Sequence, residues 1–473
     1  MARLLAFLLL FPVFISNAQE KWDLKKCIEY ALENNLQIRQ SRLNEEASRN
    51  QLTQSKADFF PNLNADLSYG VNFGRSVDPT TYDFVNQRIQ TSSLSGSSGI
   101  TLFNGLNKIN TLKQGKKDVL SSQYATEDIV NTVSLNITSS FLQILLNTEA
   151  QKTTEERLKL SSEQVANTQK LVDAGVLPEG NLFDVQAQQA TDSFTYIVAK
   201  NAVELSKLNL AIMLQLDDPA AFDVLIPEIN VTPPALLKNN SAENVYATAL
   251  NNQASVKSAS YAVESAEKSL LAMRGLYYPN LGFYYNLRTN HSSIAKRITA
   301  DVDPQNILIG YVDDGSFTPV RTVYNAPVYE KAPFLGQYND NLNHTLGFSL
   351  TVPIFNGLQT RMAVKNMQLQ TLKAKYALKA VQDKLKSDVY VAYADAKAAY
   401  QKFLAAQNSV SALNKSMEYV TKKFNLGAAT TLEYSTASNN LLGAQSQLLQ
   451  AKYDYIFKLK VLDFYLGNPI TLE

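Results

Sequence analysis

The sequence repeats itself, and this constrains the fold more than any other feature. The segment FFPNL at 59–63 returns as YYPNL at 277–281, with an offset between the prolines of 279 − 61 = 218. The segment LFNGL at 102–106 returns as IFNGL at 354–358, with an offset between the glycines of 357 − 105 = 252. Because the landmarks recur in order, each half of the chain must contain the same elements in the same order.

A third landmark closes each copy of the repeat. The tetrad LDDP at 216–219 matches LGNP at 466–469, at an offset of 250. The chain therefore reads as one unit used twice, over 19–219 and 241–469, and a proline- and asparagine-rich linker at 220–240 joins the copies. The second copy carries an insertion of 252 − 218 = 34 residues between its first two landmarks.

The two ends of the chain lie outside the repeat. Residues 1–18 combine an early Arg3, an apolar run at 4–15 and a small-residue cleavage site, which is typical of a secretory signal peptide. The apolar run is too short to span a bilayer, and no transmembrane helix is expected further along the chain. Residues 470–473 form a short C-terminal tail.

Each copy begins with a helical pattern and then changes to a strand pattern. Asp23 and Ser241 are predicted N-caps, and one helix is expected from each cap to the aromatic–proline joint. After Pro61 and Pro279, which cannot continue a helix, apolar residues alternate with polar ones. This alternation predicts four strands in two hairpins, at about 62–74, 92–103, 280–290 and 342–355.

The polar face of these strands distinguishes two interpretations. A half-buried sheet in a soluble domain would also alternate. Here, however, the polar face is small and uncharged, as in Asn64, Ser68 and Ser349, and each strand is about ten residues long. Aromatic residues also stand at the strand ends. This pattern favours a transmembrane barrel with its apolar face towards lipid and an aromatic girdle at the interface.

Very long helices follow the strands. Residues from 106 to about 172, and from 358 to about 426, contain no proline. At about 1.5 Å per residue, each helix would be roughly 100 Å long. Gly175 and Gly427 predict a turn at the end of each long helix, and a return helix of about 35 residues follows each turn.

Four strands cannot close a barrel by themselves. An open sheet edge in lipid leaves backbone groups without hydrogen bonds, and known single-chain barrels have at least about eight strands. Copies of the chain must therefore pool their strands. Two copies would give eight strands with a filled interior, and three copies would give twelve with room for a lumen.

The chain resembles the outer membrane efflux protein (TolC-like) family in three features. It has two helix–hairpin–long-helix–return-helix units, repeated FFPNL and LFNGL segments, and glycine turns followed by LFDVQAQ or LEYSTAS. The resemblance implies an α+β membrane protein: a homotrimer with a twelve-stranded β-barrel in the outer membrane of a Gram-negative bacterium, continued by an α-helical barrel in the periplasm. It implies the exit duct of a tripartite efflux pump or type I secretion system, partnered by a periplasmic adaptor and an inner-membrane pump. A periplasmic coiled-coil or adaptor protein without a channel is the alternative.

The resemblance also implies a periplasmic aperture closed by acidic side chains just after the second glycine turn. Glu433 matches the first acidic position of that pattern, and Thr436 replaces the second. Asp184 stands at the corresponding place in the first copy, and Glu179 lies in the preceding turn. The alternative for Glu433 is an ordinary solvated charge at a helix end. We expect Glu433 to narrow the aperture and favour cations.

Two further sets of residues are candidates for contacts. The resemblance implies that the tip turns contact the adaptor. The alternative is that these residues only pack within the turns: Gly175, Val176, Leu177, Leu426, Gly427 and Ala428. The second set marks the barrel–helix junctions at the inner boundary of the membrane: Phe60, Pro61, Phe103, Gly105, Tyr278, Pro279, Phe355 and Gly357.

The remaining features do not suggest catalysis. The net charge of +1 favours neither nucleic acid nor another anionic partner. Two histidines and one cysteine, Cys27, cannot form a zinc cluster or a His-based triad, and we expect no enzyme activity and no cofactor. Residues 294–341 contain DVDP and VDDG, which supply too few ligands for calcium, and an exposed loop over the barrel mouth is expected there.

Overall fold

The computed structural model describes residues 21–77, 82–227 and 241–469. The predicted signal peptide, most of the predicted linker and the C-terminal tail lie outside these residues. The chain divides into two compact units. The helical unit comprises Met1–Asn50, Lys116–Ala266 and Gln370–Glu473, and the sheet unit comprises Gln51–Gly115 and Glu267–Leu369.

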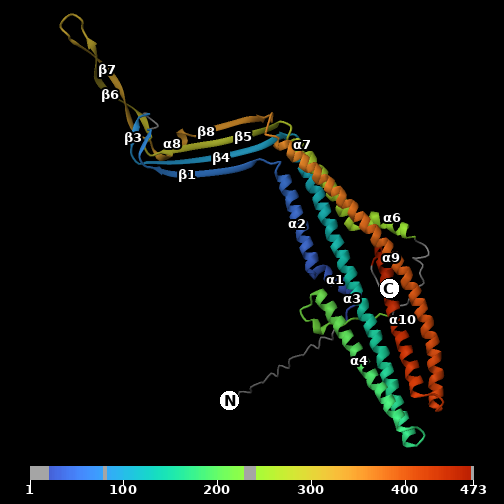
Figure 1. The fold of residues 1–473 in the computed structure, drawn as a ribbon. Coiled ribbons are helices and arrows are strands. Elements are labelled where there is room, and N and C mark those ends of the chain that lie inside the picture. Colours follow the sequence, from blue (N-terminus) through green and yellow to red (C-terminus); the bar gives the residue numbers. More distant parts are fainter. Residues whose placement is uncertain (1–20, 78–81, 228–240, 470–473) are drawn as a thin grey trace, which may run out of the picture. The chain divides into compact units, whose positions relative to one another are not determined.

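Each repeat contains two consecutive helices, a long helix and a return helix (Figure 1). In the first repeat these are α1 (Leu24–Asn34), α2 (Leu36–Ala57), α3 (Asn107–Asp173) and α4 (Glu179–Leu214). In the second they are α6 (Ala242–Asn252), α7 (Ala254–Gly275), α9 (Gln359–Asn425) and α10 (Thr431–Leu466). A 3-10 turn, η1 (Pro219–Ala221), follows α4.

The helices of the two repeats have equal lengths. Both α3 and α9 have 67 residues, and both α4 and α10 have 36, so the offset of 252 holds to the last residue of the return helix. Gln215 (φ 61°) and Gly467 (φ 85°) then end these helices in the same left-handed conformation. The match of LDDP with LGNP at an offset of 250 was therefore wrong by two residues, because backbone geometry pairs Gln215 with Gly467.

The prediction of one helix before each hairpin was also wrong. Asn35 (ψ 127°) and Gln253 (ψ 129°) take extended conformations that break the helix in both repeats. The Asn35 side chain accepts hydrogen bonds from the backbone N–H of Gln37 at 2.9 Å and of Ile38 at 3.4 Å, and so caps α2. A side chain that caps the next helix makes the break local and specific.

The N-caps of α1 and α6 are those that the sequence predicted. Asp23 Oδ1 accepts the backbone N–H of Lys26 at 2.7 Å, and Ser241 Oγ accepts that of Asn244 at 3.2 Å. Each bond satisfies one of the amide groups that a helix leaves unpaired at its start.

The core of the helical unit lies where α1, α3 and α4 meet. Buried residues at spacings of three and four along α3 face this core, with Ile137, Phe141 and Ile144 fully buried. Cys27 packs among them, and the equivalent residue of the second repeat, Val245, lies in a matching cluster with Val389. The prediction of a small apolar packing role for Cys27 is confirmed.

One stretch of α3 is long and apolar enough to cross a membrane by length and composition alone, and 44% of that stretch is buried. Phe141 and Ile144 of α3 are fully buried in the core of the helical unit.

The sheet unit contains four antiparallel strands in the order β1, β4, β5, β8 (Figure 1). Their bounds are Asn62–Asn72, Ile89–Asn104, Asn280–Ser292 and Asn343–Thr351. The last strand is shorter than the predicted 342–355, since Pro353 lacks the N–H that a ladder needs. Within the described residues, β1 and β8 are the two edges of the sheet.

The pairing register proves that the two hairpins are equivalent. In the first hairpin Asn62 pairs with Gly99, and in the second Asn280 pairs with Thr351. Adding the repeat offsets to the first pair gives 62 + 218 = 280 and 99 + 252 = 351, which is the second pair. The sequence offsets therefore hold residue for residue in the sheet.

Opposed residues of an antiparallel pair point to the same face of the sheet. Leu67 opposes Leu94, Phe283 opposes Phe348, and Ser68 opposes Ser93. One face, the apolar face, therefore carries most of the leucine, phenylalanine and tyrosine side chains, and the polar face carries mainly asparagine, serine, threonine and glycine. Leu63 is 83% exposed and Phe348 is 68% exposed, so most of the apolar face lies uncovered in the single chain.

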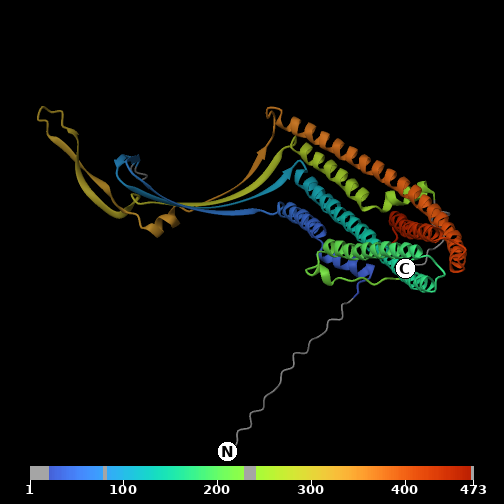
Figure 2. The same ribbon diagram turned by 60° about the horizontal axis from the view of Figure 1, so that its bottom comes forward.

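The segment predicted as a long exposed loop is mostly exposed, but it forms regular strands, so the prediction of a loop was wrong (Figure 2). Its position over the barrel mouth stays a prediction. It forms a separate hairpin, β6 (Lys296–Tyr311) and β7 (Pro319–Lys331), followed by a short helix, α8 (Phe334–Asp340). Its valines, isoleucines and tyrosines are strand formers, although their alternation is weak. A small pair, β2 (Arg75–Val77) and β3 (Phe84–Asn86), lies within the connection of the first hairpin.

Candidate functional site: the helix tips and the strand–helix junctions

The two tip turns share one backbone geometry. Gly175 (φ 74°) and Gly427 (φ 72°) adopt the left-handed conformation that was predicted for them. After α3, Val176 N–H donates to Leu171 O and Gly175 N–H donates to Val172 O, both at 2.8 Å. The end of α9 has the same pair of hydrogen bonds. This pattern satisfies the last carbonyl groups of a helix and favours glycine at the turn.

The apolar residues of the tips are exposed. Leu426 is 84% exposed and Val176 is 66% exposed, whereas Leu177 is half-buried. Ala428 is also exposed. Within a single chain, therefore, Val176 and Leu426 are largely uncovered, and Leu177 is partly covered.

Glu433 has a local structural partner in addition to any role at an aperture. Thr430 is the N-cap of α10: its Oγ1 accepts Glu433 N–H at 3.2 Å, and Glu433 Oε2 accepts Thr430 N–H at 2.7 Å. This reciprocal capping box holds the carboxylate at the start of the helix. The Thr430 backbone N–H, followed by the Thr430 hydroxyl, lowers the pKa of Glu433, so the side chain is charged at neutral pH.

The other predicted aperture residues are exposed and lie on the first turns of the return helices. Glu179 begins α4, Asp184 lies one turn further, and Thr436 lies on α10. Since α4 and α10 have equal lengths, Asp184 is equivalent to Thr436 (184 + 252 = 436) and Glu433 is equivalent to Asn181. Each repeat therefore supplies one of the two acidic positions. The role of these four residues at an aperture stays a prediction.

A buried ion pair between α3 and α4 was not predicted from the sequence. Arg157 Nε on α3 lies 2.9 Å from Asp192 Oδ1 on α4, and these side chains are only 10% and 3% exposed. Gln188 Nε2 also donates to Asp192 Oδ1 at 2.9 Å. The signal in the sequence is weak, although Asp192 is the one acidic residue between Asp184 and Glu204.

The same arginine reaches the second repeat. Arg157 donates to Ser438 O at 3.2 Å and to Asn439 Oδ1 at 2.6 Å, both on α10. A separate hydrogen bond also joins α3 to α10: Tyr453 OH of α10 donates to Glu149 Oε1 of α3 at 2.6 Å. Burial, and then the bond to Glu149, raises the pKa of Tyr453 far above its usual range. Polar side chains of α3 therefore tie the first repeat to α10.

At the junctions, a glycine permits the backbones of two elements to meet. Gly105 (φ 63°) follows β4, and a Cβ there would lie 2.1 Å from Gly275 O at the end of α7 and 2.8 Å from Tyr278 Cβ. Asn107 Nδ2 donates to Ala272 O at 2.7 Å and fixes the same approach. Leu106 (φ 64°) is also left-handed, which the sequence did not reveal.

The second junction has the same turn, but no helix end packs against its glycine within the described part of the single chain. Gly357 (φ 62°) and Leu358 (φ 68°) repeat the conformation of the first junction, yet a Cβ at Gly357 would meet nothing within 4 Å. The aromatic residues of the junctions are exposed, with Phe355 at 81%, Phe60 at 72% and Tyr278 at 60%. Pro61, Phe103 and Pro279 flank these turns. Their membrane depth stays a prediction.

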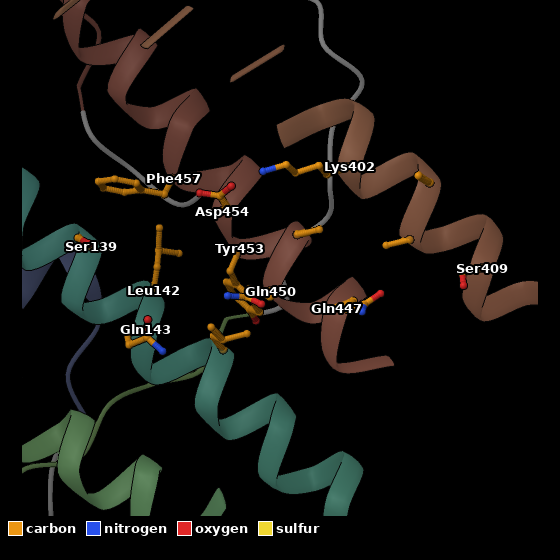
Figure 3. A pocket seen from close by; sticks show the side chains of 14 residues that line it. Ser139, Leu142, Gln143, Lys402, Ser409, Gln447, Gln450, Tyr453, Asp454 and Phe457 are labelled. Carbon is orange, nitrogen blue, oxygen red and sulfur yellow. The ribbon is translucent and has the colours of Figure 1, made fainter. Parts of the chain in front are cut away.

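An open groove of about 850 Å³ lies between α3, α9 and α10 in the helical unit (Figure 3). Leu142 and Gln143 come from α3, Lys402 from α9, and Asp454 and Phe457 from α10. Its lining mixes amide, charged and apolar groups without a nucleophile–base pair. Across 21–77, 82–227 and 241–469, no group of three or more His, Cys, Asp or Glu side chains is placed to hold a metal ion.

Four amphipathic strands with an uncovered apolar face, joined to long helices with glycine tip turns, define a class: membrane channels that combine a β-sheet with a helical extension. The family model described as outer membrane efflux protein matches residues 27–214 and 245–468. The chain belongs to this family. It is an outer-membrane efflux channel of the Gram-negative type and has no enzyme activity.

Individual relatives agree with this assignment. The outer membrane efflux protein BepC of Brucella suis biovar 1 (strain 1330) is 22% identical over 458 residues, which cover 95% of this chain and 86% of BepC. The Campylobacter jejuni CmeC outer membrane channel has a similar fold, with a TM-score of 0.74 at 16% identity over 94% of this chain and 85% of CmeC. The Vibrio cholerae outer membrane protein VceC gives a TM-score of 0.73 at 14% identity over 95% and 97%. The predicted family and location are confirmed, and so is the predicted α+β fold class apart from its trimeric assembly, which stays a prediction. The alternative of a periplasmic protein without a channel is wrong.

Proposed function

We propose that this chain is the exit duct of a tripartite efflux pump or type I secretion system, and that three copies close one barrel and one tunnel. The observation that carries the proposal is the sheet of four strands whose edges, β1 and β8, are both open. An open edge cannot persist in lipid, because its backbone groups would have no partners. The edges must therefore pair between copies of the chain.

The internal repeat predicts the register of that pairing. Within the chain, β4 of the first repeat pairs with β5 of the second, for example Ser97 with Asn286. The equivalent strands are β8 and β1, at 97 + 252 = 349 and 286 − 218 = 68. Ser349 of one copy should therefore oppose Ser68 of the next. Both side chains lie on the polar face, as a pair must.

Three copies explain the composition of the polar face better than two. Twelve strands leave a lumen, whereas eight strands enclose only side chains. The polar face carries small groups such as Ser68, Gly70, Ser97 and Gly347, which would not fill the interior of an eight-stranded barrel. Polar side chains and space are what a water-filled passage requires.

Cysteine crosslinking across the proposed seam tests the assembly. We expect Ser68→Cys/Ser349→Cys, treated in membranes with a short thiol crosslinker, to give a ladder of covalent species that ends at the trimer. The matched control, Ser68→Cys/Thr345→Cys, has the same faces but a register wrong by four residues and should give much less product. A ladder ending at the dimer, or equal yields from both variants, would overturn the proposal. The native Cys27 is fully buried and should not interfere.

The exposed tips are the proposed contact for a periplasmic adaptor, through which an inner-membrane pump would deliver substrate. Leu426 and Val176 offer exposed apolar side chains at both turns. A photo-crosslinking residue at Leu426 should capture one protein in cells, and the same residue at Lys25, also exposed but on α1, should not. Mass spectrometry of the product would identify the adaptor. Capture at both positions alike would contradict a specific tip contact.

A further inference from the structure

The short helix α8 packs on the apolar face of the sheet, at the strand ends furthest from the junctions. Ser92 opposes His291, and Leu94 opposes both Leu67 and Thr289, so Ser92, Thr289 and His291 all point to the apolar face. Tyr338 OH of α8 donates to Ser92 Oγ at 2.8 Å, and Thr289 Oγ1 donates to Tyr338 O at 2.6 Å. The helix therefore lies on the side that the barrel turns towards lipid.

The helix covers polar groups at this end of the apolar face. Ser92 is 7% exposed and Thr289 is 4% exposed, although both belong to the lipid side of the sheet. Gln337 is also buried, and its side chain accepts Ser292 N–H at 2.9 Å and donates to Ala332 O at 3.0 Å. Every one of these polar groups has a partner. Without α8, these polar groups would face hydrocarbon without hydrogen-bond partners, which costs free energy.

The first turn of the helix exposes apolar side chains, whereas its last turn exposes Asn339 and Asp340. Phe334, which packs on His291 with ring centroids 4.6 Å apart, remains 55% exposed, and Leu335 is 78% exposed. This surface continues the apolar face of the strands, where Leu346 is 68% exposed. A surface continuous with the lipid-facing wall of a barrel has the outer membrane as its neighbour.

The height of the helix above the junctions fits the boundary of the membrane. From Leu281 to His291, β5 advances 291 − 281 = 10 residues. At about 3.4 Å per residue and a strand tilt of about 40°, this corresponds to roughly 26 Å along the barrel axis. The apolar band of an outer-membrane barrel is about 25 Å tall. The helix therefore lies where the hydrocarbon of the outer leaflet gives way to headgroups.

We propose that α8 is an interfacial anchor: Phe334 and Leu335 enter the outer leaflet at the level between acyl chains and headgroups, and fix the depth of the barrel. Aromatic and apolar side chains on a short helix over polar strand ends are what that boundary layer accommodates. The proposal requires the outer-membrane location of the family and does not depend on the number of copies, the adaptor or the pump.

Tryptophan fluorescence with brominated lipids tests the depth. The chain has one native tryptophan, Trp22, in the helical unit, whose emission serves as a constant background. In phosphatidylcholine nanodiscs, Leu335→Trp should lose intensity more with bromine near the glycerol end of the acyl chain than with bromine near its methyl end. Leu346→Trp, about midway along the strands on the apolar face, should show the opposite order.

A matched control separates depth from face. Asn290 lies at the same height as α8 but on the polar face, so Asn290→Trp should be quenched little by either lipid. If Leu335→Trp behaves like Asn290→Trp, the helix meets water or protein instead of lipid, and the proposal is wrong. If it behaves like Leu346→Trp, the helix lies in the hydrocarbon core and the proposed interfacial position is wrong.

Discussion

The two repeats share a backbone but not the contacts that hold their helices together. Their long helices and return helices match residue for residue, and their hairpins keep one pairing register although β4 has 16 residues and β8 has 9. The buried pair Arg157–Asp192 nevertheless exists only in the first repeat, because its equivalents in the second are Ser409 (157 + 252) and Ala444 (192 + 252). Duplication has therefore preserved lengths and turns, whereas the polar contacts between helices have diverged.

The largest expected difference between the repeats concerns the two junction glycines. Gly105→Ala would place a Cβ 2.1 Å from Gly275 O, and a backbone oxygen of a helix end cannot move aside. Gly357→Ala meets no atom within 4 Å in the single chain and costs only the left-handed strain of about 1–2 kcal/mol. We expect Gly105→Ala to abolish folded protein in the outer membrane and Gly357→Ala to leave folded chains, measured by membrane fractionation and protease resistance.

The same pair of variants sharpens the proposed assembly. The repeat offset that places Gly105 against Gly275 places Gly357 against Ala57 of the next copy (275 − 218 = 57). In the Ser68→Cys/Ser349→Cys background, Gly357→Ala should therefore reduce the crosslinked trimer although the chain itself folds. Full trimer yield would argue against equivalent seams, and normal folding of Gly105→Ala would contradict the close approach itself.

The buried ion pair of the first repeat should give the next largest effect. Arg157→Met leaves Asp192 without its cation inside the bundle, and breaking a buried pair typically costs about 3–5 kcal/mol. We expect a corresponding fall in the denaturation midpoint of the purified protein in detergent. Arg157→Met/Asp192→Leu should recover most of the loss, since an apolar pair needs no charge partner.

The equivalent change in the second repeat is the control for the ion pair. Ser409→Met occupies the same helical position where no charged partner exists, and its effect should be small. An equal loss from Arg157→Met and Ser409→Met would mean that side-chain size rather than the ion pair stabilises the bundle.

Substitutions of Glu433 can distinguish its role in the helix cap from its role as a charge. Only the second return helix has this cap, because Pro178 at the start of α4 makes no side-chain hydrogen bond. Glu433→Gln keeps a capping acceptor and removes the charge, whereas Glu433→Ala removes both. Fraying of the first turn of α10 should therefore increase in Glu433→Ala alone. Single-channel recordings should show weaker cation selectivity in both variants. Unchanged currents in both would refute a role at the aperture.

The cap also has a pH dependence of defined sign. The pKa of Glu433 is lowered by the Thr430 amide, so the charged cap is present at neutral pH and weakens as pH falls through the lowered pKa. Glu433→Gln, which does not titrate, should remove this acid sensitivity from the opening of the α10 end, measured by amide hydrogen exchange. An acid response unchanged in Glu433→Gln would assign it to another group.

The smallest expected effect is the exchange of one core residue between repeats. Cys27→Val copies Val245, and it should change the free energy of unfolding by less than about 1.5 kcal/mol. Burial raises the pKa of the Cys27 thiol from 9.0 to about 12. Its contribution is therefore present below pH 9 and is lost as pH rises towards 12, so Cys27→Val should flatten the alkaline stability profile. Rapid alkylation of native Cys27 at pH 8 would contradict its burial.

Sequence reasoning succeeded where the pattern is periodic and failed where a single side chain decides. Alternation located the four strands, and glycine located the tip turns, because these follow from local backbone geometry. The breaks at Asn35 and Gln253 were missed since neither residue forbids a helix. The pair Arg157–Asp192 was missed because its members lie 35 residues apart and meet only after α4 folds back on α3.

The sequence by itself determined the repeat, the order of the elements, the lengths of the long helices and the family, because spacing and periodicity are properties of a linear chain. The tertiary structure alone decided which polar groups meet: the arginine that ties α3 to α10, the carboxylate that caps its own helix, and the helix α8 that covers the polar end of an apolar face. Such contacts depend on side chains that come together only when distant segments pack. The order and type of the elements can therefore be predicted from the sequence more readily than the side-chain contacts between them.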